Sequence, residues 1–372
     1  MHTIKLLISI SAILGFFDLS AQKLTSVAPL PAGLSESSGL HYLNGRLLSI
    51  EDSGNDNLVF EIDSLTGNIS REVVIGNADN TDWESITADE NFIYIGDFGN
   101  NNGTREDLKI FKIPLGEYLA GDATQTVEVI SFSYADQTDF SSNPFATNFD
   151  AEAFCSFGDS LILFTKNWIN GYSKIYKLPK IQGEYEIEAI DSINTEGFVT
   201  GCTCGSELGL IHLIGHNSLL VPFAVRISDF SPDQITDGEI SRVELSASFG
   251  QSTQIEGVAQ TYPGKFFVSS EAFFNTQALL YELFWGIDLS IKNPQKLYLD
   301  GFISPNPNDG FFQVNVDEYT ELRLIDHTGK IIYTSEKLPH YHINIAPGLY
   351  TVILQNRMKH KIASQRLVII NH

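Results

Sequence analysis

Several residue types are scarce in this chain, and each scarcity excludes a class of protein. The 372 residues include only 3 cysteines, which excludes a disulfide-dense scaffold. Lysine and arginine number 23 against 46 aspartates and glutamates. The net charge of −23 excludes nucleic acid or an anionic membrane as partner, because their phosphates would be repelled. The apolar fraction of 43% is nevertheless that of a globular protein, so wholesale disorder is excluded too.

Common catalytic motifs are also missing. The sequence has no Gly-x-Ser-x-Gly elbow, no His-Glu-x-x-His zinc motif and no glycine-rich phosphate-binding loop. No segment shows the periodicity of a convincing amphipathic helix. The repeated strands and the acidic residues therefore remain as the informative features.

Long apolar runs are absent except at the N-terminus. Lys5 precedes an apolar run over 6–17, and the small residue Ala21 precedes Gln22. This order is typical of a secretory signal, so we expect cleavage after Ala21 and a soluble chain outside the cytoplasm, with no transmembrane segment. A membrane anchor is the alternative, but the run is shorter than the roughly 20 residues that a span requires.

Charge divides the remaining chain into two parts. Residues 302–372 contain six acidic and seven basic side chains, whereas residues 22–301 carry a net charge of −24. A turn-forming string, Ser304-Pro-Asn-Pro-Asn-Asp-Gly310, lies beside this change. We therefore expect a signal peptide over 1–21, a large domain over 22–300 and a small domain over 301–372.

The larger part contains an internal repeat. Five segments share one order, in which a polar opening leads into an apolar strand and then into a second apolar strand with a polar end. The openings are Ser35–Leu40, Asp82–Ile86, Asp150–Phe154, Gly201–Gly205 and Gln254–Val258. The second strands are Leu47–Asp52, Phe92–Asp97, Leu161–Asn167, Leu210–His216 and Phe266–Glu271.

This repeat predicts an all-β fold. The strands are short, β-branched and aromatic, and Gly, Asn and Asp separate them. Five units of about four strands are typical of a five-bladed β-propeller, whose blades surround a central channel. Six blades are one alternative, because 114–148 is long enough to hold further strands, and a plain β-sandwich is another. We expect Lys23–Ala28 to supply the outer strand of the last blade and close the ring.

The repeat also predicts that polar side chains meet at one mouth of the channel. The residue that opens the first strand and the residue that closes the second reach the same end, because the two strands are antiparallel. The two members of each pair are 13 to 16 residues apart. The pairs are Glu36 with Asp52, Glu84 with Asp97, Glu152 with Asn167, Thr203 with His216, and Glu256 with Glu271.

So many carboxylates would repel one another unless a cation neutralised them. Oxygen ligands suit calcium better than zinc, so calcium is the ion we expect. Two alternatives stay open, namely side chains that only hydrogen-bond the neighbouring blade, and direct catalysis. For His216 the alternative is a histidine on a surface turn. The loops 52–57 and 96–103 are rich in oxygen ligands but lack the pattern of the twelve-residue calcium loop.

The three cysteines fall in two neighbouring units. Cys155 lies in the third unit, and Cys202 and Cys204 lie in the fourth. Adjacent inner strands would bring Cys155 near either of them, and a Cys-x-Cys bridge would be strained, which favours Cys155 with Cys204. Three reduced, buried thiols are the alternative.

The motif series of the larger part resembles a known group of proteins. The series Glu-Ser-Ser-Gly-Leu, Glu-Asp-Ser-Gly-Asn, Asp-Trp-Glu-Ser-Ile and Gly-Asp-Phe-Gly-Asn-Asn is similar to that of secreted Bacteroidetes propellers. These are distantly similar to phytase-like esterase, NHL-type and gluconolactonase-type propellers. The gluconolactonase type holds calcium with a Glu, an Asn and an Asp. The resemblance implies Glu36, Asn167 and either Asp52 or Asp97 for those parts, but a shared fold does not confer the chemistry.

Residues 302–372 predict a small β-sandwich, which by itself is also consistent with an ordinary binding module such as a carbohydrate-binding sandwich. The order of its motifs resembles the type A C-terminal sorting domain of the type IX secretion system. This resemblance implies the secretion machinery as a partner, and export across the outer membrane to the cell surface or the medium. The residues that carry it are Pro305, Asn306, Pro307, Gly310, Gly329, Lys330, Gly348 and Tyr350.

Two functions follow from these patterns. The first is an exported propeller that binds an extracellular ligand of unknown identity and is stabilised by calcium. The alternative is a calcium-dependent hydrolase of the lactonase or phosphoester type. Phosphoester chemistry recruits basic side chains, and the motif positions offer only Lys166 and, further into a loop, Arg105, which favours binding.

Overall fold

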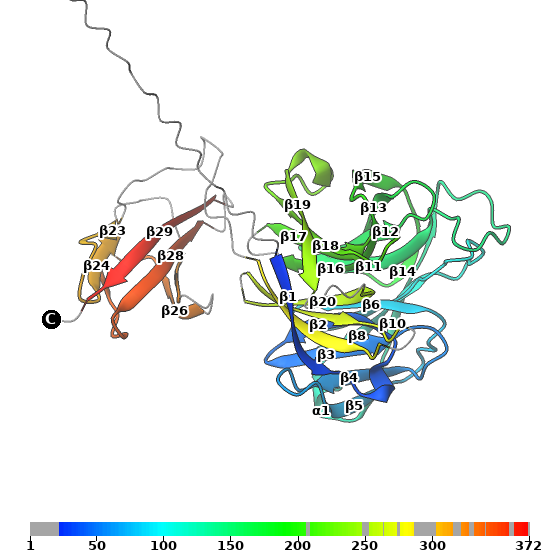
Figure 1. Ribbon diagram of the computed structural model, residues 1–372, viewed down its shortest axis with the longest axis horizontal. Helices are drawn as coiled ribbons and strands as arrows, with labels where there is room; N and C mark the ends of the chain where they lie inside the picture. Colours follow the sequence, from blue (N-terminus) through cyan, green and yellow to red (C-terminus); the bar gives the residue numbers. More distant parts are fainter. Residues whose placement is uncertain are drawn as a thin grey trace, which may run out of the picture.

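The computed structural model describes residues 22–205, 209–247, 253–262, 264–273, 276–285, 303–314, 321–326, 331–338, 340–356 and 361–370. Nearly all of its regular structure is β-strand (Figure 1). The signal peptide predicted over 1–21 lies outside these residues.

Five four-stranded blades form the larger part, and their strands are given from the inside outward. The first blade is β2 (Ser37–Leu43), β3 (Arg46–Glu51), β4 (Leu58–Ile62) and β5 (Ile69–Ile75). The second is β6 (Trp83–Ala88), β7 (Phe92–Asp97), β8 (Lys109–Pro114) and β10 (Glu128–Tyr134). The third is β11 (Asp150–Phe157), β12 (Ser160–Lys166), β13 (Tyr172–Pro179) and β15 (Ala189–Asn194). The fourth is β16 (Phe198–Gly205), β17 (Leu210–His216), β18 (Pro222–Ser228) and β19 (Glu239–Ala247). The fifth is β20 (Ile255–Tyr262), β21 (Lys265–Ser270), β22 (Leu279–Phe284) and β1 (Gln22–Pro29).

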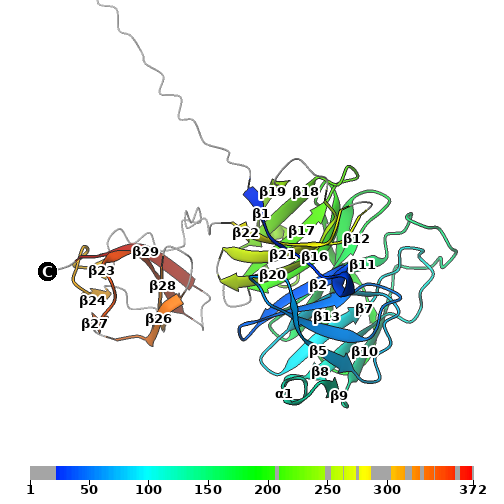
Figure 2. The same cartoon turned by 60° about the horizontal axis from the view of Figure 1, so that its bottom comes forward.

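The inner strands form a closed ring (Figures 1 and 2). In the order β2, β6, β11, β16 and β20, each strand contacts the next, and β20 contacts β2. The five-bladed propeller is therefore confirmed. The stretch that suggested a sixth blade forms the helix α1 (Leu115–Ala120), the short strand β9 (Ala123–Thr124), β10 and a loop. The six residues of α1 are too few to show a helical period in the sequence.

Two short strands and two 3-10 turns lie outside the twenty blade strands of the propeller. The strand β9 pairs with the outer edge of β5, and β14 (Gly183–Ile187) pairs in parallel with β10 of the second blade. Two 3-10 turns, η1 (Ala32–Leu34) and η3 (Ile235–Asp237), lie in connections between strands.

The N-terminal strand closes the ring as the sequence predicted. Residues Leu24–Pro29 of β1 pair antiparallel with β22, and Gln22–Leu24 pair in parallel with β19. The strand coloured blue in Figure 1 thus joins the first described residues to the last blade. Because β1 supplies the fourth strand of the fifth blade, that blade is complete and the ring is closed. Propellers protect the edges of their sheets in this way.

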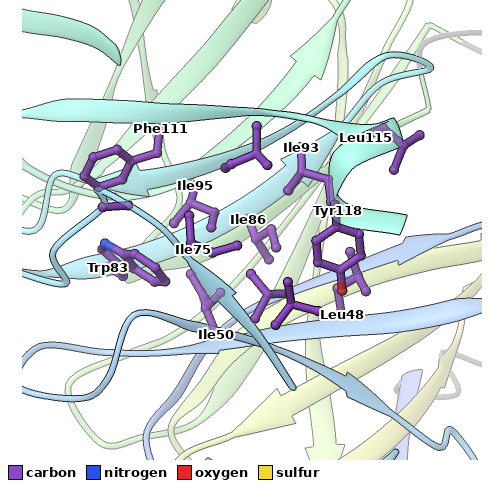
Figure 3. Packing of buried hydrophobic residues seen from close by; sticks show 14 residues of the cluster. Leu48, Ile50, Ile75, Trp83, Ile86, Ile93, Ile95, Phe111, Leu115 and Tyr118 are labelled. Atoms are coloured by element: carbon purple, nitrogen blue, oxygen red, sulfur yellow. The ribbon is translucent and has the colours of Figure 1, made fainter. Parts of the chain in front are cut away.

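The hydrophobic core lies mainly between successive blades. Between the first two blades, Leu48 and Ile50 of β3 pack against Trp83, Ile86 and other fully buried side chains of the second blade (Figure 3). Strands with apolar residues on both faces are expected here, since each blade is covered by a neighbour on either side. Burying one such side chain contributes roughly 1.5–3 kcal/mol relative to leaving it exposed.

The C-terminal residues form a small β-sandwich, in agreement with the prediction. One sheet contains β23 (Ile303–Ser304), β24 (Phe311–Val314) and β27 (Tyr341–His342). The other contains β26 (Ile331–Glu336), β25 (Glu321–Ile325), β28 (Gly348–Asn356) and β29 (Lys361–Ile369). Phe312 and Tyr341 of the first sheet share one core with Leu322, Leu324 and Val352 of the second.

The sorting motif has a structural role in this sandwich. The Asn306 side chain accepts a hydrogen bond from the backbone N–H of Val368 (2.9 Å), and Tyr350 donates its hydroxyl to Ala346 O (2.6 Å). Gly310 has φ 97°, in the region that favours glycine. Pro305 and Pro307 each follow a cis peptide bond, and Gly348 opens β28. Gly329 and Lys330 lie outside the described residues.

Candidate cation and ligand site at one end of the ring

Each inner strand contains a β-bulge near its beginning, and the bulges align the blades better than the sequence does. The extra residues are Ser38, Glu84, Glu152 and Thr200, and in the fifth blade the irregularity covers Glu256 and Gly257. A bulge re-aims the side chain that it carries. The equivalent of Glu84 is therefore Ser38 in the first blade and Thr200 in the fourth, whereas the sequence comparison placed Glu36 and Thr203 at those positions.

Two of these bulge residues connect neighbouring blades. Ser38 Oγ donates to Trp83 O (2.7 Å), and Thr200 Oγ1 donates to Ile255 O (2.6 Å). Both carbonyl groups directly precede the bulge glutamate of the next blade. The expected hydrogen bonding between blades is thus made by hydroxyl groups, and the glutamates at the other bulges have a different environment.

The implied gluconolactonase-type ligand set does not come together in this structure. Asp97 accepts the backbone N–H of Asp82 (2.9 Å) and pairs with Arg105 (3.0 Å) within its own blade. Asn167 donates to Tyr172 O (2.7 Å), and its Oδ1 accepts the N–H of Ile169 (3.1 Å), so it closes its own turn.

Glu36 also departs from that implied set. Its side chain is exposed and accepts a hydrogen bond from Asn55 (2.8 Å). Of the four residues that the resemblance implied, only Asp52 joins a carboxylate cluster.

The end of the ring at which the inner strands begin is strongly acidic. We define this acidic end by Asp52, Asp82, Glu84, Asp150, Glu152, Lys166, His216, Glu256 and Glu271. The sequence analysis did not include Asp82, Asp150 and Lys166 among the candidate site residues, although it noted Lys166 as a basic side chain at the motif positions. The repeated aspartate at the start of the motif, in Asp82-Trp-Glu and Asp150-Ala-Glu, was the signal that could have found two of them.

Three carboxylates of the first two blades lie together. Asp52, Asp82 and Glu84, here called the carboxylate trio, each place an oxygen within 4.8 Å of the others. A Cβ on Gly99 would lie 2.5 Å from the Asp82 carboxylate and would also collide with Glu84 Oε1, so a larger residue there would displace the carboxylates of the trio.

Glu84 is the most unusual member of the trio. It is only 8% exposed, and its carboxylate makes no hydrogen bond or ion pair with the residues that the structure describes. Burial and then the nearby carboxylate of Glu152 raise the pKa of Glu84 well above its usual range. Burial and then Asp52 raise the pKa of Asp82 to about 7. The trio therefore favours either bound protons or a bound cation.

A single ammonium group serves the third and fifth blades. Lys166 Nζ is buried 3.2 Å from Glu152 Oε1. Burial alone would lower the pKa of Lys166, but Glu152, Glu256 and other carboxylates outweigh it and hold that pKa well above its usual range. Asp150 accepts hydrogen bonds from the backbone N–H of Asn100 (2.6 Å) and from Trp168 Nε1 (2.7 Å), and so fixes the adjoining loops.

Two polar atoms beside Lys166 have no partner. His216 Nε2 and Glu256 Oε1 lie 3.9 Å apart, and both are buried without a hydrogen bond to any described residue. Burial and then Lys166 lower the pKa of His216 to about 4, so the ring is neutral at neutral pH. Its Nδ1 donates to Asn217 O (3.1 Å), which leaves a lone pair on Nε2.

The interpretation of His216 as a surface histidine is wrong, since it is 5% exposed.

Glu271 lies at the outer part of the same end. It accepts a hydrogen bond from Gln254 Nε2 (2.6 Å). Burial and then Glu256 raise the pKa of Glu271 to about 9. This carboxyl group is therefore protonated at neutral pH unless a cation compensates it.

The structure joins Cys155 of β11 to Cys204 of β16, the pair that the sequence favoured. The disulfide connects the inner strands of the third and fourth blades. Cys202 is a buried free thiol whose pKa burial raises well above its usual range, so it is an inert side chain of the core.

The comparisons with known proteins identify the C-terminal domain. Residues 303–370 match the family of the secretion system C-terminal sorting domain. The domain indicates export through the type IX secretion system to the cell surface or the medium. No helix among the described residues combines the length and apolar character needed to cross a membrane. No curated protein matches the chain.

Solved structures add only weak similarities. The chain is similar to PorZ, a surface component of the type IX secretion system of Porphyromonas gingivalis, with 14% identity and a TM-score of 0.32. That match covers 93% of this chain and 46% of PorZ, so the chain spans less than half of that protein. It is also similar to the WD40 propeller domain of Doa1, with 10% identity, a TM-score of 0.31, and coverage of 93% and 87%. Similarity at this level assigns no activity.

Proposed function

We propose that this protein is an exported binding module whose propeller holds a calcium ion at the carboxylate trio. The observation that carries the proposal is Glu84, a carboxylate that is 8% exposed, makes no hydrogen bond or ion pair with a described residue and lies beside two further carboxylates. A buried charge of this kind costs several kcal/mol unless it is paired or protonated.

The donor atoms favour calcium over zinc. Asp52, Asp82 and Glu84 offer only oxygen, which is the donor that calcium prefers, whereas zinc favours nitrogen and sulfur. Bound calcium would compensate the repulsion within the trio and tie the first blade to the second, because Asp52 follows β3 and Glu84 lies in β6. The ion would thereby stabilise the end of the ring that binds a ligand.

A thermal melt of the chain after signal removal, with calcium or with EGTA, tests this proposal. We expect 5 mM calcium to raise the melting temperature of the wild type by several degrees, because the ion binds only the folded state. Glu84→Gln should lose that rise and be at least as stable as the wild type in EGTA, since the buried charge is gone. Glu72→Gln, at an exposed site on β5, should retain it. A wild type that melts equally in calcium and EGTA would refute the calcium site.

A calcium-dependent hydrolase is the second candidate. Glu152 favours it, because burial raises its pKa well above the usual range and would let it act as a general acid. Turnover of lactone or phosphoester substrates that is lost in both Glu84→Gln and Glu152→Gln would support this alternative. Turnover that is unchanged in both variants would exclude the acidic end as its site.

A further inference from the structure

The third and fourth blades bring a row of aromatic rings to the acidic end. Phe145 and Trp168 have ring centroids 5.0 Å apart, Trp168 and Phe198 are 4.8 Å apart, and Phe198 and His216 are 6.0 Å apart. Trp168 follows β12, Phe198 begins β16 and His216 ends β17, so the row crosses from one blade to the next. We call Phe145, Trp168 and Phe198 the aromatic row.

The aromatic row is accessible and held in place. Phe145 is 61% exposed, and Trp168 and Phe198 are partly exposed. The hydrogen bond from Trp168 Nε1 to Asp150 Oδ2 (2.7 Å) orients the indole ring. Neighbouring aromatic rings that are exposed to solvent often mark an interaction site. Ligand sites typically combine such rings with a few polar groups, as this row does with the buried polar cluster beside it.

The polar atoms at the inner end of the row lack a hydrogen-bond partner among the described residues. His216 Nε2 and Glu256 Oε1 lie 3.9 Å apart, which is beyond hydrogen-bond reach, so the two atoms do not satisfy each other. Lys166 Nζ, 5.0 Å from the centre of the Trp168 ring, is a donor in the same place. Two unsatisfied acceptors and one donor thus lie next to the aromatic row.

We propose that the aromatic row, Glu256, His216 and Lys166 bind a neutral carbohydrate. A pyranose ring has C–H groups on its faces, which are attracted to the negative faces of aromatic rings, and hydroxyl groups at its edge. Its hydroxyl groups can pair with Glu256, His216 and Lys166, through a bridging water where the buried His216 Nε2 and Glu256 Oε1 are out of direct reach. A cationic ligand fits less well, because Lys166 already places a positive charge against Trp168 and Glu152.

This inference rests on the proposed binding role but not on calcium. The carboxylate trio and the carbohydrate site share no residue, so the two can be tested separately. Trp168 is also a convenient reporter, because Trp83 and Trp285 are 0% and 6% exposed and the sequence has 3 tryptophans in all.

Calorimetric titration of the chain after signal removal, in calcium and in EGTA, tests the inference. The probes are neutral hexasaccharides of glucose, mannose, xylose and N-acetylglucosamine, with hexalysine as the cationic probe. We expect at least one sugar to bind saturably and to change the tryptophan fluorescence. Trp168→Ala and Glu256→Gln should each weaken binding by about tenfold or more, because each removes a contact of about 1.4 kcal/mol or more.

Matched variants separate recognition from folding. Trp168→Phe keeps an aromatic ring and should bind within about threefold of the wild type, whereas Trp168→Ala should not. Phe284→Ala, which removes an aromatic ring that is 51% exposed on β22, should bind like the wild type.

Three results would each overturn the inference. They are failure of all four sugars to bind, binding by Trp168→Ala that equals that of the wild type, and hexalysine binding that depends on Trp168. A calcium-dependent melt without sugar binding would overturn this inference alone, and the reverse result would overturn the calcium site alone.

Discussion

Burial is the main influence on the pKa values of the side chains at the acidic end. Lys166 is the only buried ammonium group described there, and it serves Glu152, Glu256 and the carboxylates beyond them. Burial makes the carboxyl groups of this end hold their protons to higher pH, as at Asp82 and Glu271, and at Glu152 the charge of Lys166 offsets only part of that effect. The pKa of His216, in contrast, is lowered, because burial disfavours the charged ring and, to a smaller extent, because Lys166 would repel a second buried cation. Each pKa shift thus follows from the low polarity of one small region.

Stability should therefore depend on pH when calcium is absent. The pKa of Glu271 is raised to about 9, so its proton stabilises the folded state at low pH and is lost as the pH rises through that value. We expect urea unfolding in EGTA to show a loss of about 2 kcal/mol between pH 7.5 and pH 9. Glu271→Gln should flatten this dependence, and Glu244→Gln, at an exposed site, should not. An equally steep loss in Glu271→Gln would contradict the assignment.

The elements of the ring are joined by a repeated device, the bulge at the start of each inner strand. Where the bulge carries a hydroxyl group, as at Ser38 and Thr200, the side chain bonds the carbonyl group of the next blade. Where it carries a glutamate, as at Glu84, the side chain is buried without such a bond among the described residues. The same backbone irregularity therefore connects blades at some junctions and carries a buried carboxylate at others.

The hydroxyl bonds should contribute measurably to stability. Thr200→Val keeps the shape of the side chain but leaves the buried carbonyl group of Ile255 without this donor. We expect a loss of about 1–2 kcal/mol in the free energy of unfolding, measured with urea. Thr200→Ser retains a hydroxyl group and should lose less. If the valine variant is as stable as the serine variant, the bond contributes nothing to the junction.

The whole propeller depends on closure of the ring by β1. The first described strand pairs with β22 and β19, and Leu24 is fully buried between the fourth and fifth blades. Without β1, the backbone groups of β22 would be an unpaired edge that invites association with other chains. The disulfide between Cys155 and Cys204 closes a span of 49 residues and adds a covalent link between the third and fourth blades.

Deletion of residues 22–29 should disrupt the molecule rather than one strand of it. We expect the shortened chain to form oligomers or aggregates in gel filtration and to lose the cooperative thermal transition of the wild type. Lys23→Ala and Thr25→Ala, which change exposed side chains of β1, should elute like the wild type with little change in melting temperature. A deletion variant that elutes and melts like the wild type would show that closure by β1 is dispensable.

Much of this architecture is encoded locally. Alternating and wholly apolar strands at a regular spacing predicted five blades, and an apolar strand ahead of the first repeat predicted the closing β1. The cysteines fall in two neighbouring units, and the inner strands of neighbouring units lie side by side. Their positions therefore favoured the disulfide between Cys155 and Cys204, which the structure contains. The order of turns and strands after residue 302 likewise identified the sorting domain. The spacing of the strands and the alternation of their side chains suffice for such conclusions, because successive side chains of a strand point to opposite faces of the sheet.

Only the tertiary structure decided which polar residues meet. A bulge shifts that alternation by one residue, so Ser38 and Thr200 rather than Glu36 and Thr203 occupy the positions equivalent to Glu84. Asp97 and Asn167 have the expected spacing, yet their hydrogen bonds keep them within their own blades. The burial of His216 and the approach of Gly99 to the trio depend on packing between segments far apart in the chain. Spacing places a side chain at an end of a strand, but its direction and its partners are set by contacts that no local pattern contains.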